Sequence, residues 1–115
     1  MKKTISLLSA LLLSTLLSTR ADILGQWTFE LNTPADLANS ATISGIAADF
    51  GSGTASGVHA SALSDWSTFV GNGSANSLSV NNWTVGDYFQ FQVSTIGFTG
   101  IGISFDQTSS GTGPR

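Results

Sequence analysis

Two short segments in the second half of the chain alternate apolar and polar residues, which is the pattern of a half-buried β-strand. Phe89, Phe91 and Val93 alternate with glutamines in residues 88–93, and large apolar residues alternate with Gly and Ser in residues 101–105. A period of two places the apolar side chains on one face of a strand. The short glycine-containing connection predicts that the two segments pair as antiparallel neighbours, with Phe89, Phe91 and Val93 facing the core.

The rest of the chain after residue 21 also favours strands over helices. No window repeats apolar residues at the spacing of three, four and seven that a helix needs. We therefore predict an all-β fold, an antiparallel β-sandwich or a jelly-roll-like domain over residues 22–115, preceded by an N-terminal signal helix. Two strands with an uncovered apolar face are marginal in water, so we expect the sandwich to be incomplete. Weaker strand candidates, bounded by Gly, Asn and Ser turns or by Pro34, are residues 23–29, 42–50, 62–70 and 77–80.

Residues 1–21 have the features of a bacterial secretory signal peptide: two early lysines, an apolar run and a small-residue exit. The apolar run, residues 5–17, has thirteen residues including four Ser or Thr, whereas a membrane span needs about 20 mostly apolar residues. Thr19 and Ala21 form a small-x-small cleavage site, so the mature chain is predicted to begin at Asp22. We expect a secreted, extracellular protein without a membrane span after cleavage.

The predicted mature chain is acidic and has almost no positive charge. Three of the four Lys and Arg residues lie within residues 1–21, which leaves one basic residue against seven acids, a formal net charge of −6. A surface for nucleic acid or anionic lipid needs clustered Lys and Arg, so these partners are excluded. The chain contains no Cys, and this excludes disulfides, thiol chemistry and thiolate metal sites.

Several short aromatic and glycine-rich motifs follow the signal segment in a fixed order. Together they resemble the N-terminal part of secreted bacterial proteins of the PEP-CTERM sorting-domain type. In that family further strands and a C-terminal sorting segment follow, so the resemblance implies that this sequence is a fragment or a prematurely ended reading frame. It also implies an extracellular or exopolysaccharide-associated role and supplies no catalytic residues. The motifs are Gln26-Trp27-Thr28-Phe29, Trp66 in a Gly/Ser/Ala-rich region, Trp83-x-x-Gly86-Asp87-Tyr88-Phe89-Gln90-Phe91 and Ser110-Gly111-Thr112-Gly113-Pro114.

Few residues offer catalytic or metal-binding chemistry. His59, the single histidine, lies in a Gly/Ala segment without a nucleophile or further ligands nearby in sequence, which predicts a surface or loop position. Asp49, Asp65, Asp87 and Asp106 offer carboxylates for glycoside hydrolysis or a structural Ca²⁺ site, but no EF-hand or Ca²⁺-binding repeat surrounds them. Asp87 and Asp106 are interpreted as turn residues at strand ends. No catalytic, cofactor-binding or metal-binding residue is predicted, and a structural Ca²⁺ stays an alternative.

The three tryptophans differ in context. Trp27 lies within a strand candidate and is expected in the core, whereas Trp66 and Trp83 lie in polar, turn-rich segments. Exposed aromatic rings stack on sugars, so Trp66 and Trp83 are candidate glycan-stacking residues. The sequence therefore predicts a non-enzymatic secreted or cell-surface module, with polysaccharide or cell-surface components as candidate partners. The alternative is a carbohydrate-binding module of an exported hydrolase, and a third hypothesis is a secreted enzyme.

Overall fold

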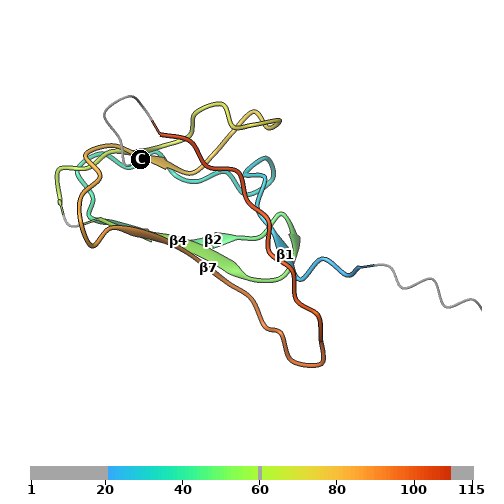
Figure 1. Cartoon of the computed structure of the whole chain (residues 1–115). Helices are drawn as coiled ribbons and strands as arrows, with labels where there is room; N and C mark the ends of the chain where they lie inside the picture. Colours follow the sequence, from blue (N-terminus) through green and yellow to red (C-terminus); the bar gives the residue numbers. More distant parts are fainter. Residues whose placement is uncertain (1–20, 60, 110–115) are drawn as a thin grey trace, which may run out of the picture.

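The computed structural model describes residues 21–59 and 61–109, and within these ranges the fold is all-β (Figure 1), as the sequence predicted. The predicted signal helix up to residue 20 and the whole of the last motif, residues 110–114, lie outside the described residues. None of the described residues belongs to a helix that is long and apolar enough to cross a membrane. The strands are β1 (Gly25–Gln26), β2 (Thr42–Ala47), β3 (Phe50–Gly51), β4 (Thr54–Val58), β5 (Trp66–Ser67), β6 (Ser79–Val80) and β7 (Tyr88–Gln92).

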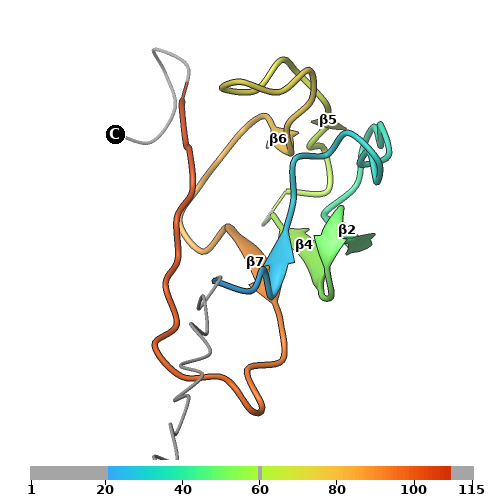
Figure 2. The same cartoon turned by 90° about the vertical axis from the view of Figure 1, so that its right-hand side faces the viewer.

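A three-stranded antiparallel sheet in the order β2-β4-β7 is the framework of the molecule. The β5–β6 pair lies on the other side of the core, and Figures 1 and 2 show these two layers one above the other. The β1–β3 pair lies at one end of the larger sheet. The described strands thus form a small antiparallel sandwich, held by packing alone because the chain has no cysteine.

The edge strand β2 contains a bulge that gives the core two of its four buried apolar residues. Ile43 pairs with Gly57 and Ile46 with Ala55, so two residues of β2 stand opposite one residue of β4. In a regular strand, residues three apart point to opposite faces. The extra residue brings Ile43 and Ile46 to the same face, where they are 4% and 7% exposed. Gly45 in the bulge has φ +72°, a left-handed conformation that glycine adopts without a Cβ clash.

The two layers meet where the indole ring of Trp66 lies against the backbone of Gly57. Trp66 is fully buried, and a Cβ atom at position 57 would overlap the end of its six-membered ring. The Trp66 Nε1–H donates a hydrogen bond of 2.8 Å to the Ser40 carbonyl oxygen, which satisfies the buried indole. Phe89 packs on the same cluster with its ring centroid 6.1 Å from Trp66. The core therefore combines one large aromatic ring with a strand of small residues.

The central strand β4 is absent from the sequence-based predictions. Its sequence, Thr-Ala-Ser-Gly-Val, has small residues where a strand facing a core ordinarily has large ones. Ala55 is fully buried and Gly57 is buried beneath Trp66. Large apolar side chains are absent from β4 because the Trp66 indole of the opposite layer fills the space that they would occupy.

The predicted strand at residues 88–93 is confirmed as β7, but its predicted partner is wrong. β7 pairs with β4, and residues 101–105 form no strand. Gly97 and Gly100, with φ of +86° and +68°, turn the chain twice after β7, and the following segment runs apart from the sheet (Figure 2). Phe89 packs against the core as expected, whereas Phe91 remains 51% exposed with its ring against Trp27.

Each of the weaker strand candidates contains an observed strand, but the predicted ranges are longer than the strands themselves. Residues 23–29 contain only β1, residues 62–70 only β5, and residues 77–80 only β6, while residues 42–50 contain β2 and the start of β3. Phe29 has φ +62° and thereby ends the extended conformation after β1. Trp27 is partly buried against the core, in agreement with its expected position.

Glycine-to-alanine substitutions test the contact between the layers. Gly57→Ala should lower the free energy of unfolding by about 1–3 kcal/mol, because the new methyl group overlaps Trp66. Gly45→Ala meets no atom within 4 Å, so only its left-handed backbone opposes the change, at about 1 kcal/mol. Gly102→Ala, in open space, is the control and should change stability by less than about 0.5 kcal/mol in urea unfolding. A Gly57→Ala effect as small as that of Gly102→Ala would contradict the tight packing of Trp66.

Candidate functional site

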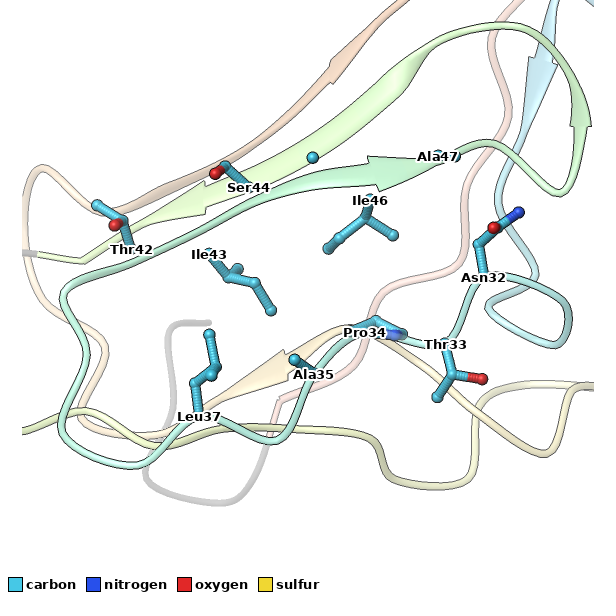
Figure 3. A pocket seen from close by; sticks show the side chains of 11 residues that line it. Asn32, Thr33, Pro34, Ala35, Leu37, Thr42, Ile43, Ser44, Ile46 and Ala47 are labelled. Atoms are coloured by element: carbon cyan, nitrogen blue, oxygen red, sulfur yellow. The ribbon is translucent and has the colours of Figure 1, made fainter.

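An open groove of about 400 Å³ lies between the edge strand β2 and the preceding loop (Figure 3). Pro34 and Leu37 come from the loop, and Ile43 and Ile46 come from β2. In Figure 3 these side chains point toward the space between the two segments. Pro34 contributes to this arrangement because it cannot donate a ladder hydrogen bond, so the loop stands off from the strand.

No charged residue lines the groove, although the chain is acidic. Thr33, Thr42 and Ser44 bring hydroxyl groups to its margins beside the apolar wall residues. Asn32, at one end, donates its amide to the Ala48 carbonyl oxygen at 3.0 Å, so its side chain is held in place. Pro34, Ile43 and Ile46 are buried and form the floor of the groove, so its accessible surface consists of Leu37 and the neutral hydrogen-bonding groups, which suits a neutral ligand. No sequence motif signalled it, because it arises from the spacing between a loop and a strand edge.

The Asp49 carboxylate organises the loop that leads into the groove. Its oxygens accept hydrogen bonds from the backbone N–H groups of Thr28 (2.8 Å), Asn32 (2.8 Å) and Glu30 (3.3 Å) and from the Thr28 hydroxyl (2.6 Å). Partial burial alone would raise the pKa of Asp49, but the hydrogen bonds from Thr28, Asn32 and Glu30 outweigh burial and hold this pKa well below its ordinary value. Because donors surround the oxygens, the carboxylate serves as a fixed structural anion.

Two further carboxylates bind loops in the same way. Asp65 accepts the Asn39 backbone N–H at 3.2 Å, and Glu30 accepts the Asn76 backbone N–H at 3.0 Å. Asp106 lies in the exposed segment after β7. Among residues 21–59 and 61–109, no group of three or more His, Asp or Glu side chains is arranged to hold a metal ion.

His59 lies in the loop that follows β4, as one of the predicted alternatives had it, but it is buried, so a surface position is wrong. Its side chain and that of Asp87 are both fully buried, with Nε2 3.0 Å from the Asp87 Oδ2 atom. Nδ1 accepts the Ser61 backbone N–H at 2.8 Å, which leaves the proton of the neutral ring on Nε2, facing Asp87. The Nε2–H bond is not aligned with the oxygen, so the contact is a polar pair at ion-pair distance and not a well-formed hydrogen bond.

The surroundings of this pair give it a structural role. The Asp87 Oδ2 atom also accepts the Thr84 backbone N–H at 2.6 Å, so Asp87 closes the turn before β7, as the sequence suggested. The Trp83 ring lies edge-on to the imidazole with a centroid distance of 6.4 Å. The imidazole therefore joins the end of β4 to the beginning of β7 and presents no surface to a substrate.

The two candidate glycan-stacking tryptophans have different surroundings. Trp66 is fully buried, so its predicted stacking role is wrong: neither face of the indole is open to a sugar ring. The polar residues around it in sequence do not make it exposed, because the Trp66 backbone itself forms a reciprocal hydrogen-bonded pair with Leu37 (3.0 and 2.9 Å) that holds the indole in the core. Trp83 is partly exposed and packs on Phe89 with a centroid distance of 4.9 Å. Its stacking role stays a prediction.

The anchoring role of the Asp49 carboxylate can be tested by comparing the unfolding of the unaltered chain with that of an Asp49→Asn variant at two pH values. At pH 7 the substitution should lower the free energy of unfolding by about 1–2 kcal/mol, because an amide cannot accept all of the N–H donors. The folded-state pKa lies below the ordinary value of 3.8, so the stabilisation is complete above that value and is lost as the pH falls below it. Urea unfolding at pH 7 and pH 3 should show the difference between the two chains shrinking. A constant difference would contradict the anchor.

Removal of the imidazole tests the buried pair. His59→Ala should lower the free energy of unfolding by about 2–3 kcal/mol, because it leaves a cavity beside Trp83 and removes the polar contact between Nε2 and the Asp87 carboxylate. A surface histidine would change stability by less than about 0.5 kcal/mol. Thermal and urea unfolding measure the effect, with the exposed Asp106→Asn as a control that should match the unaltered chain.

Comparison of the chain with family models, with curated proteins and with solved structures gave no match. Its function must therefore be inferred from the chemistry of its own residues.

Proposed function

We propose that the chain is a non-enzymatic extracellular module that binds neutral polysaccharide in the groove beside β2. The observation that carries this proposal is the uncharged, open groove between residues 32–37 and the β2 edge. An extended polymer can enter such a groove along its length. The signal-like residues 1–21 support an extracellular location, in keeping with a matrix-associated role.

The chemistry of the groove favours sugars over charged ligands. The apolar face of a pyranose ring can pack against the exposed side chain of Leu37, and sugar hydroxyls can bond to Thr33 and Ser44. The excess of acids over basic residues opposes an acidic polymer by long-range repulsion. The buried position of His59 supports the non-enzymatic part of the proposal, since the single histidine serves the fold.

A carbohydrate-binding module of an exported hydrolase is the second candidate. Trp83 supports it, because its indole is partly exposed beside Phe89 and can offer an aromatic surface to a sugar ring. Trp83 does not line the groove. The two candidates therefore place the ligand at different residues and can be separated by mutation.

Binding to a panel of neutral and acidic polysaccharides tests the proposal. Leu37→Glu brings a charge into the groove and should weaken retention on a neutral polysaccharide at least tenfold in an affinity-electrophoresis or pull-down assay. Leu63→Glu is the matched control, because Leu63 is 72% exposed outside the groove, and it should bind like the unaltered chain. Circular dichroism checks that each variant is folded.

The following results distinguish between the two candidate functions and test export. Loss of binding by Trp83→Ala with an unaffected Leu37→Glu variant would favour the second candidate. Absence of binding to every polysaccharide would contradict the groove proposal. Recovery of the protein from the culture medium with Asp22 as its first residue would support export, and recovery from the cytosol with residues 1–21 attached would contradict it.

A further inference from the structure

Residues 88–105 form a run of eighteen residues without a charged side chain in a chain whose other segments carry seven acids. This run includes β7 and the segment that leaves it. Edge strands in soluble proteins are commonly protected by charged side chains, and this run has none. Two copies of an acidic chain repel one another least where neither carries charge. Residues 66–86 form a second, longer uncharged run, and residues 88–105 differ from it because they contain the five-residue strand β7.

The segment after β7 exposes large apolar side chains that nothing in the described part of the chain covers. Ile101 is 47% exposed, Ile103 88% and Phe105 79%, and they alternate with Gly102 and Ser104 as in a strand. The preceding turn adds further exposed apolar surface at Ile96 (89%) and Phe98 (45%). The backbone of residues 101–105 is nevertheless in no ladder. This segment has the pattern of a strand and lacks a partner.

β7 offers the matching partner surface. It pairs with β4 on one side, and within the described residues its other edge has no ladder partner. β7 has five residues, the length of the segment 101–105, and on its two faces Tyr88 and Phe91 are 48% and 51% exposed. An added strand that places its apolar residues on the side of Phe91 would cover the exposed part of that ring and bury its own apolar face.

We propose that residues 101–105 of one copy pair as a strand along the free edge of β7 of a second copy, reciprocally, so that the chain forms a closed dimer. The area is sufficient. At roughly 150–200 Å² for each large side chain, the five exposed apolar side chains of residues 96–105 supply on the order of 600 Å² per copy, of which the three in residues 101–105 supply about 400 Å². Two segments then reach the lower end of the ~1,200–2,000 Å² that specific interfaces bury. The left-handed glycines Gly97 and Gly100 carry the segment away from its own sheet, which disposes it toward another chain.

Cross-linking between differently labelled chains tests the proposal directly, because the chain has no cysteine of its own. Gln90→Cys and Ser104→Cys each lie on the side of their segment opposite the alternating phenylalanine or isoleucine residues. When the two single variants are mixed under oxidising conditions, a disulfide-linked heterodimer should form at several times the yield given by either variant mixed with a Val85→Cys control. A disulfide formed within the double variant and not between the mixed single variants would show an intrachain hairpin and overturn the proposal.

Solution mass provides the second measurement. Light scattering after size exclusion should show the mass of two chains, and Ile103→Lys should weaken the dimer at least tenfold without changing the circular dichroism spectrum. Val85→Lys is the matched control, because Val85 is 98% exposed outside the run, and it should remain dimeric. A monomer at 100 micromolar, a dimer that survives Ile103→Lys, or an open series of larger species would each overturn the reciprocal exchange.

Discussion

The contact between the Trp66 indole and the Gly57 backbone holds the sandwich together. Trp66 comes from the smaller layer and reaches the central strand of the larger one, where any side chain at position 57 would exclude it. The β2 bulge then completes the enclosure by turning both Ile43 and Ile46 toward the ring. With four buried apolar residues in the core, the fit of this single ring decides whether the two layers remain together.

Carboxylates without cationic partners shape the loops of this molecule. In most proteins a buried or half-buried carboxylate faces Lys or Arg, but after residue 21 this chain has one basic residue, Arg115. Asp49, Asp65 and Glu30 instead accept backbone N–H groups from loops that have no ladder partner. These hydrogen bonds satisfy both groups, because loop amides need acceptors and carboxylates need donors. The Asp49 carboxylate holds the backbone of the loop that leads into the groove.

The sequence allowed the fold class and the position of β7 to be predicted, because a clear period of two needs no tertiary information. It could not reveal β4, whose small residues are explained only by the tryptophan packed against them. Nor could it reveal that His59 meets Asp87, because 28 residues of chain separate two side chains that the β4–β7 pairing brings together. The burial of Trp66 was hidden for a related reason: polar neighbours suggested exposure, but Trp66 itself pairs with Leu37 and Val80. The groove depends on the distance between segments, which no local pattern encodes.

The two outer strands of the main sheet are unlike one another. β2 is kinked by its bulge and faced by the loop at residues 32–37, so its rim is irregular and partly occupied. β7 is straight in register along all five residues. The two edges of this sheet therefore differ in their ability to pair with another strand. The regular edge of β7 can accept an added strand, whereas the bulge and the loop hinder pairing at β2. The pairing along β7 proposed above would therefore leave no second regular edge among the described strands of this sheet from which a fibre could grow.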